Sequence, residues 1–122
     1  GGELLKLLDK VAYTCAMRYC GTYVVTLSVD KVLFKEPIAI GELVSLKAAV
    51  NYTGRTSMEV GIRVVAENLE TGSVRHTNSC YFTMVAVDKA GAGKPTRVPP
   101  LVPSTDEEQR RWDEALQRRN TR

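Results

Sequence analysis

The feature that most constrains the fold is a single long amphipathic stretch at the start of the chain, residues 1–20. At about 100° per residue, its apolar residues fall on one stripe. That stripe is widened by Leu5 and Ala16, and its central members are Leu4, Leu8, Val11, Ala12, Cys15 and Tyr19. The spacing predicts a buried helix that ends at Gly21, where a glycine cap is expected. Any sheet formed by the rest of the chain has this one apolar helix available to cover it.

Asp9 is the polar residue of this helix that needs an explanation. It falls on the edge of the apolar stripe, at helical spacing from Ala12 and Ala16, where a carboxylate is costly unless something uses or satisfies it. One interpretation is a solvated acid, or one paired with Lys6 or Lys10. The other is a reactive acid with room beside the two small alanines. Spacing alone leaves both interpretations open.

The helix also begins with two glycines, Gly1 and Gly2. A helix start carries backbone N–H groups without intrahelical partners, at its positive end. Such donors can hold the oxygen of a polarised carbonyl, and an acid such as Asp9, two turns along, can act on a water. The two features together suggest a site for attack on a carbonyl carbon.

After Gly21 the pattern changes to an alternation that predicts strands over residues 22–34, 43–52, 58–69 and 74–88. In the first strand, Val25, Leu27 and Val29 are expected on one face. Tight turns at 53–57 and 70–73 favour antiparallel pairing, because parallel strands need long crossovers. We therefore predict an α+β fold in which a long antiparallel meander of four strands wraps around the first helix. A strand before Gly1 would complete the sheet.

The composition shifts near residue 90. Gly91, Gly93 and the prolines from Pro95 to Pro103 predict an extended arm. Residues 104–107 (STDE) form a capping box, which predicts a charged helix from there to about residue 119, docked through Trp112. The expected boundaries are therefore 1–90 for the main domain and 91–122 for the Pro/Gly-rich arm and the charged C-terminal helix.

The composition is that of one ordinary soluble globular domain, with 43% hydrophobic and 25% charged residues in a chain of 122. The formal net charge of +3 does not favour a nucleic-acid partner, no apolar run is long enough for a membrane span, and no signal peptide precedes the first helix. Cys15, Cys20 and Cys80 show no C-x-x-C spacing, so reduced thiols and a cytoplasmic location are expected. With His76 as the one histidine, neither a metal cluster nor a Ser-His-Asp triad is favoured.

Six segments of the chain occur in an order and spacing typical of a known family. They are GGELLKLLDKVA, VVTLSVD, TGRTSMEVGIRV, ENLETG, YFTMVAVD and VPPLVPSTDEE. These segments resemble the hotdog-fold acyl-CoA thioesterases, in particular the acyl-CoA hydrolase group with brain-type cytosolic and small bacterial members. The resemblance implies that residues 1–90 form a hotdog acyl-CoA hydrolase domain without its first strand. The family usually carries an Asn a few residues before the glycines, a position that lies before Gly1.

The resemblance implies an enzyme, a thioester hydrolase that releases free fatty acid and coenzyme A (CoA) from fatty acyl-CoA. Asp9 would activate water or attack the thioester directly, and the backbone N–H groups of Gly2 and its neighbours would hold the developing oxyanion. The active site would form at an interface of a homo-oligomer, with a dimer as the minimal unit and a hexamer, a trimer of dimers, as the expected state. CoA is then part of the substrate, and neither a separate cofactor nor a metal is expected.

For CoA binding, the resemblance points to residues of two strand segments and of the basic end of the last helix: Leu27, Ser28, Val29, Thr56, Ser57, Met58, Arg118 and Arg119. Pantetheine amides can pair along a strand, and the hydroxyl and N–H groups of a turn suit a pyrophosphate. Arg55 lies beside the turn, and it is either a further CoA contact or an ordinary exposed turn residue.

Two other functions of the same fold remain open. A dehydratase of the hydratase type needs a histidine beside the acid, and His76 would have to reach Asp9 from the last strand. A catalytically inactive hotdog domain would instead serve as an acyl-CoA binding or structural subunit. Cys15, central on the buried stripe, is expected to pack in the core and not to act as a nucleophile.

Overall fold

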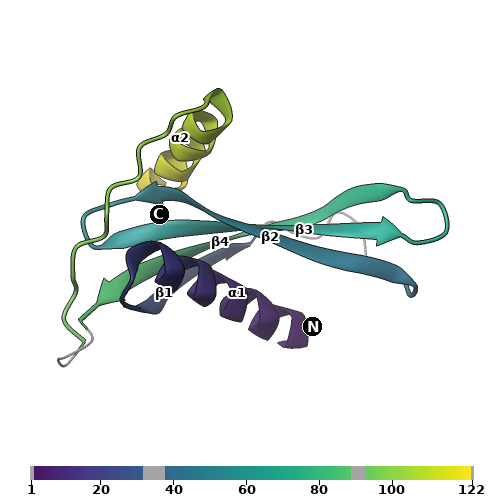
Figure 1. Cartoon of the computed structure of the whole chain (residues 1–122), viewed down its shortest axis with the longest axis horizontal. Helices are drawn as coiled ribbons and strands as arrows, with labels where there is room; N and C mark the ends of the chain where they lie inside the picture. Colours follow the sequence, from purple (N-terminus) through teal and green to yellow (C-terminus); the bar gives the residue numbers. More distant parts are fainter. Residues whose placement is uncertain (1, 32–37, 89–92, 122) are drawn as a thin grey trace.

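The computed structural model describes residues 2–31, 38–88 and 93–121 (Figure 1). Its elements in chain order are α1 (Gly2–Cys20), β1 (Tyr23–Lys31), β2 (Glu42–Thr53), β3 (Ser57–Asn68), β4 (Val74–Val87) and α2 (Asp106–Asn120). Two helices and four strands were expected in this order. The end of the first predicted strand, residues 32–34, lies outside the described residues, as does Gly1. Of the helices in the described ranges, none has the length and apolar character that crossing a bilayer requires.

The sheet is antiparallel throughout, but its order is β1-β4-β3-β2. Strands β2, β3 and β4 form the expected meander through the turns at residues 54–56 and 69–73. The expectation that β1 continues this meander is wrong, because β1 pairs with β4 along its length and leaves one side of β2 without a neighbour among the described strands. Ten residues, 32–41, separate β1 from β2, which is more than the two-residue loop of a tight hairpin.

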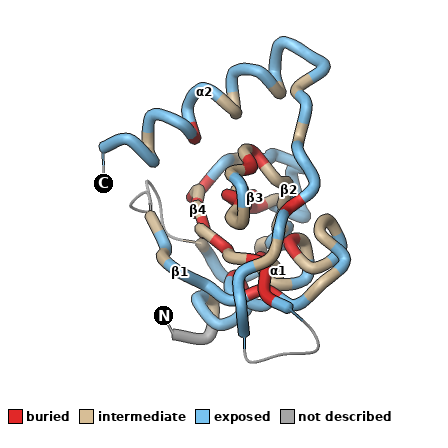
Figure 2. Tube along the Cα trace, turned by 90° about the vertical axis from the view of Figure 1, so that its left-hand side faces the viewer, coloured by how far each residue is buried: buried red, intermediate tan, exposed pale blue. Residues whose placement is uncertain are grey.

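The core lies between the sheet and α1, as the alternation in β3 predicts. The inward residues of β3 are at most 1% exposed, and they are Met58, Val60, Ile62 and Val64. Ala12 and Ala16 of α1 are fully buried, because their small side chains let the helix backbone approach the strands closely. Figure 2 shows these buried positions gathered where the curled sheet meets α1, with α2 on the other side of the strands. The predicted sheet wrapped around one helix is confirmed.

A β-bulge in β1 changes which of its apolar residues share a face. The register with β4 shifts at Leu27, which has no residue opposite it and is 68% exposed. Before the bulge, Thr26 faces α1. After it, Val29 does, because Val29 pairs with the fully buried Phe82. Val25 and Val29 therefore face opposite sides of the sheet, and the expectation that the apolar residues of β1 share one face is wrong.

The arm and α2 pack against the described sheet. The amide of Val98 donates to the carbonyl of Arg55 at 3.0 Å, and the Tyr19 hydroxyl donates to the carbonyl of Pro99 at 2.8 Å. On α2, the rings of Trp112 and Tyr52 lie with their centroids 4.4 Å apart. The expected docking of the last helix through its tryptophan is confirmed, and it occurs on the face of the sheet opposite α1.

The cap of α2 is shifted by one residue from the prediction. The N-cap is Thr105, whose hydroxyl accepts from the amide of Glu108 at 3.1 Å. In return, the Glu108 carboxylate accepts from the amide of Ser104 at 3.0 Å and from its hydroxyl at 3.1 Å. These hydrogen bonds, the backbone one first, hold the pKa of Glu108 below its usual value. Thr105 therefore caps the amide of Glu108 while the Glu108 carboxylate binds back to Ser104, and the predicted box at residues 104–107 is displaced because the helix begins at Asp106.

Removing this cap should loosen α2. Thr105→Ala is expected to lower the free energy of unfolding by about 1 kcal/mol, because the amide of Glu108 loses its acceptor. Thr105→Ser keeps an acceptor at the same place and should unfold within about 0.3 kcal/mol of the wild type. Urea denaturation of the three proteins measures this, and equal midpoints for Thr105→Ala and wild type would contradict the role of the cap.

Candidate active site

Asp9 lies on the exposed side of α1, and one of its carboxylate oxygens accepts a hydrogen bond. The Thr26 hydroxyl, on β1, donates to Asp9 Oδ1 over 3.2 Å. The same hydroxyl lies 3.5 Å from the sulfur of Met84 on β4. No ion pair reaches Asp9 within the ranges that the structure describes, so the pairing with Lys6 or Lys10 is not observed there. A strand hydroxyl thus orients an accessible carboxylate, which is the geometry of a usable base.

Thr26 was missed by the sequence analysis, which considered only the apolar residues of this strand when assigning its faces. The signal was present in its spacing, because Thr26 lies two residues from Val24, and Val24 is buried against the helix. A hydroxyl at an inward position beside an apolar helix needs a partner. Asp9 is the acid of that helix which accepts from it.

Gly2 begins α1, as predicted, seven residues before Asp9. With a rise of 1.5 Å per residue, the amide of Gly2 lies about 10 Å from Asp9 along the helix axis. A base and an oxyanion donor must each lie about 3 Å from the reacting atoms. Gly2 and Asp9 of the same helix are therefore separated by about two helical turns.

The predicted CoA residues of β1 lie around the bulge. Leu27 projects into solvent, and Val29 is partly exposed at the edge of the sheet. The Ser28 hydroxyl oxygen is buried and has no hydrogen-bond partner among the described atoms. Among the described strands, β1 has a neighbour on one side only, so the backbone groups on its other side can pair with another extended molecule.

A second group of predicted residues meets at the turn between β2 and β3. A Cβ atom built on Gly54 would lie 2.6 Å from Nη1 of Arg119 and 3.0 Å from the hydroxyl of Ser57, so the guanidinium and the hydroxyl lie together over the turn. Arg55 is exposed next to them. The carbonyl of Thr56 is already bonded to the amide of Ala86 at 2.9 Å.

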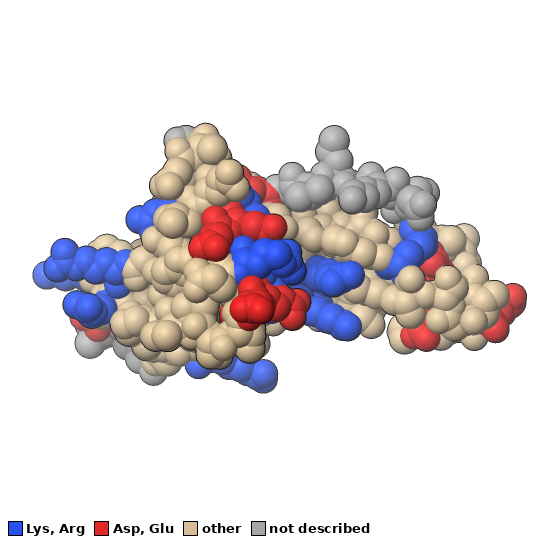
Figure 3. All heavy atoms as spheres, turned by 90° about the horizontal axis from the view of Figure 1, so that it is seen from above, with Lys and Arg blue, Asp and Glu red and all other residues tan. Residues whose placement is uncertain are grey.

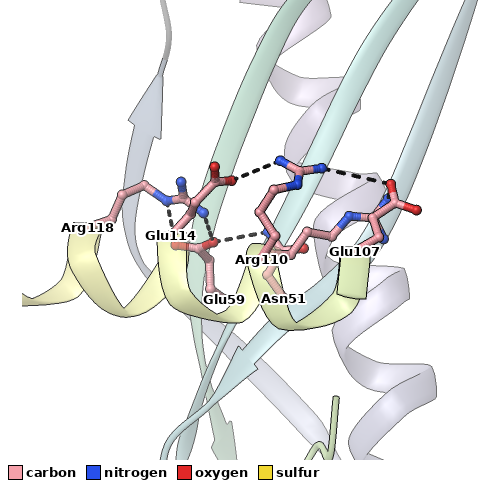
Figure 4. A network of polar contacts seen from close by, with 7 residues as sticks. Asn51, Glu59, Glu107, Arg110, Glu114 and Arg118 are labelled. Carbon is pink, nitrogen blue, oxygen red and sulfur yellow. Dashed lines mark hydrogen bonds and ion pairs between the residues drawn. The ribbon is translucent and has the colours of Figure 1, made fainter. Parts of the chain in front are cut away.

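Two other predicted CoA residues are placed differently. The Met58 side chain is 1% exposed in the core, which leaves only its backbone for a ligand. Arg118 donates two hydrogen bonds to Glu59, with Nη2–Oε1 at 2.6 Å and Nε–Oε2 at 3.0 Å (Figure 4). Its guanidinium carbon also lies 3.5 Å from the centroid of the Tyr81 ring. Burial is the largest single effect and lowers the pKa of Arg118, but the hydrogen bonds to Glu59, added to the charge interactions with Glu59, Tyr81 and Glu114, raise this pKa above its usual value. Arg118 therefore docks α2 on the sheet, whereas Arg119 reaches the turn.

Neither His76 nor Cys15 contributes a reactive group beside Asp9: His76 lies on the other face of the sheet, and the Cys15 thiol is a poor nucleophile. Nε2 of His76 is 2.7 Å from the Ser79 hydroxyl and 2.8 Å from the carbonyl of Asn78, on the face of the sheet opposite α1. The histidine beside the acid that a dehydratase needs is therefore not provided by His76. Burial raises the pKa of the Cys15 thiol, against the opposing charge of Arg18, and keeps it a poor nucleophile.

Known proteins share both this sequence and this arrangement. A family model described as the Thioesterase superfamily matches residues 1–73. Protein VdlD of Helicobacter pylori is 56% identical over 122 residues, which are all of this chain and 68% of that protein. The crystal structure of an apo-hexameric acyl-CoA thioesterase is 41% identical, has a TM-score of 0.87, and is matched over 99% of this chain and 76% of that one.

A further solved structure shows a relative with its ligands. The acyl-CoA hydrolase of Staphylococcus aureus, solved with butyryl-CoA, CoA and CoA disulfide, is 36% identical with a TM-score of 0.89. The match covers 99% of this chain and 73% of that one. The hotdog fold and the family expected from the sequence are thereby confirmed. Because the family model covers more than half of the sequence and the fold is shared along nearly all of it, this chain belongs to the thioesterase superfamily.

Proposed function

We propose that this chain hydrolyses acyl-CoA thioesters to free CoA and a fatty acid. The observation that carries the proposal is the Asp9 carboxylate, which is presented to solvent by a buried helix and oriented by the hydroxyl of Thr26 at 3.2 Å. Relatives whose names describe acyl-CoA hydrolysis support the same reaction. The family and this geometry point to one chemistry, the attack of water on a thioester carbonyl.

In the proposed reaction, Asp9 accepts a proton from a water molecule as the water oxygen bonds to the thioester carbonyl carbon. The carbonyl oxygen becomes an oxyanion. It accepts hydrogen bonds from the backbone amides at the start of helix α1 of one protomer, in particular that of Gly2. When the tetrahedral intermediate collapses, the C–S bond breaks and the sulfur leaves as the CoA thiolate. A thiolate is a good leaving group, so one base and one set of amide donors are enough.

The separation within α1 supports an active site shared between two copies of the chain. The separation of about 10 Å along one helix, together with the hexameric relative, supports a thioester that meets the acid of one protomer and the amides of another. Val25 and Leu27 of β1 present apolar side chains, 50% and 68% exposed, that a second copy would cover. A dimer is then the minimal unit, and the hexameric relative supports a trimer of such dimers.

For CoA, we propose two contact regions on the same chain. The backbone of residues 27–29 on edge strand β1 would pair with the pantetheine amides. Arg119 and Ser57, which meet over the turn at Gly54, would bind phosphate oxygens, with Arg55 beside them.

Thiol release from a panel of acyl-CoA esters of increasing chain length tests the proposed function, with the oligomeric mass measured by light scattering on the same samples. An enzyme releases CoA thiol from at least one ester with saturable kinetics. An inactive binding subunit would bind CoA in calorimetry without releasing thiol, and this result would contradict the proposal.

Thr26 is proposed as a positioning residue that acts through Asp9. Thr26→Val keeps the side-chain shape and removes the donor, so kcat should fall about tenfold with little change in KM, because the base loses its orientation. Thr26→Ser restores the hydroxyl and should recover most of the activity. A valine variant with wild-type kcat, or a serine variant as slow as the valine one, would remove Thr26 from this role.

A further inference from the structure

The face of the sheet opposite α1 carries a groove of about 590 Å³ that the reaction does not use. Its floor includes Ala49 and Gly61, which pair directly across β2 and β3, and the side-chain amide of Asn51 lies over Gly61. Helix α2 forms the roof, through Glu107, Arg110, Arg111, Glu114 and Arg118. Figure 3 shows lysine and arginine side chains gathered in the middle of the face that carries α2.

Two cations lie side by side on the floor of this groove. Lys47 of β2 is directly opposite Arg63 of β3 in the antiparallel register. Both residues are exposed, and both line the groove. Directly opposed residues have Cβ atoms about 5 Å apart, and like charges in such a pair destabilise the sheet.

Within the described part of the chain, neither cation is neutralised. Neither Lys47 nor Arg63 forms an ion pair there, whereas the arginines of the roof are paired: Arg111 with Glu107 at 2.7 Å, and Arg110 with Glu114 at 3.4 Å. The unbalanced charge of the groove is therefore concentrated on the Lys47–Arg63 pair.

Polar groups of β4 extend this pair into a row. Ser79 lies directly opposite Arg63, and its hydroxyl is 2.7 Å from Nε2 of His76. Both Ser79 and His76 line the groove. When Nε2 of the imidazole donates to the serine oxygen, the serine hydroxyl is left to donate outward. An ammonium, a guanidinium and a hydroxyl then converge from three neighbouring strands, a donor set that suits a phosphate group.

We propose that Lys47, Arg63 and Ser79 bind the phosphate group of a small phosphorylated ligand in the groove beneath α2. The groove volume is within the range of small-molecule sites. The site is distinct from the proposed CoA contacts, because Thr53 at the turn lies six positions along β2 from Lys47, about 20 Å along the strand. It also lies on the opposite face of the sheet from Asp9.

Calorimetric titration of the full chain with inorganic pyrophosphate tests this site. We expect saturable binding by the wild type, and Lys47→Gln should weaken it at least about tenfold, since one charge-assisted contact is lost. Lys94→Gln makes the same change at an exposed lysine away from the groove and should bind within twofold of wild type. Because the proposed CoA site can also take pyrophosphate, Arg119→Gln is titrated as well, and the Lys47-dependent binding should persist in it.

Lys47→Glu provides a second and opposite readout. It places unlike charges across the strands, so the melting temperature in phosphate-free buffer should rise while pyrophosphate binding disappears.

Thiol release from acyl-CoA should be unchanged in Lys47→Gln, so failure of the phosphate site is separable from failure of the proposed hydrolase. Absence of saturable binding in the wild type, or equal affinity in Lys47→Gln, would overturn the site. If the wild type did not bind pyrophosphate and Lys47→Glu had a smaller oligomeric mass than the wild type, Lys47, Arg63 and Ser79 would form a contact between copies of the chain. That result would also overturn the site.

Discussion

Asp9→Asn should lower kcat for acyl-CoA hydrolysis about a thousandfold and leave the fold unchanged. The amide keeps the shape of the carboxylate and can still accept from Thr26, but it cannot take a proton from water, and general-base catalysis of this kind contributes about 10²- to 10⁴-fold. Because Asp9 is exposed, the substitution should alter the free energy of unfolding by less than about 0.5 kcal/mol. Single-turnover thiol release separates the chemical step from CoA release and measures the loss.

Asp113→Asn is the matched control, because it makes the same change at an exposed acid of α2 whose partner in the structure is Gln109. It should keep wild-type kcat. An Asp9→Asn protein with wild-type turnover would refute the assigned role of the acid. A loss of the same size in both variants would show that the effect does not come from the base.

The largest effect on stability is expected at the contact that docks α2. Glu59 is 5% exposed in the sheet, and Arg118 neutralises it through two hydrogen bonds, while Asn51 adds a third at 3.1 Å (Figure 4). Arg118→Met leaves this carboxylate buried beside a single amide, so the free energy of unfolding should fall by about 2 kcal/mol. Chemical denaturation measures the loss, and hydrogen exchange of α2 shows whether the helix opens.

Two further variants distinguish a buried charge from a general effect of losing an arginine. Arg110→Met removes an arginine from the same helix, but that side chain is 61% exposed and its ion pairs are superficial, so less than about 0.5 kcal/mol should be lost. Adding Glu59→Gln to Arg118→Met removes the unpaired charge and should recover at least half of the lost stability. If Arg118→Met matched Arg110→Met, or if the double variant were no more stable than Arg118→Met, the ion pair would not be what holds α2.

Much of the fold was predictable because it depends on periodicity. The apolar stripe that includes Leu8 and Ala12 identified the buried helix, and the alternation from Met58 to Ala66 identified the central strand, since local spacing alone decides which side chains share a face. The order of the strands was not predictable in the same way. Strand β1 pairs with β4, more than forty residues away along the chain, and no local pattern records such a partner.

The candidate site also has a part that was predictable from the sequence and a part that was not. The position of Asp9 on the helix and the glycine start of α1 were evident from the residues, and the family resemblance gave them roles that remain predictions. The partner of the acid was not evident, because Thr26 and Asp9 meet only where β1, paired with β4, packs against α1. The different roles of Arg118 and Arg119 were not predictable either. Adjacent helix residues point about 100° apart, and which of the two arginines contacts Glu59 depends on where α2 docks.

The amino-acid sequence by itself determined the elements of this protein, their amphipathic faces and the acid that one helix carries, because these follow from the spacing of residues a few positions apart. Only the tertiary structure decided that a hydroxyl of β1 would orient that acid, that one arginine of α2 would be used for docking, and that Lys47 and Arg63 would be neighbours. These three arrangements depend on strand register and helix packing, which join residues distant in the chain and are set by the free energy of the whole fold.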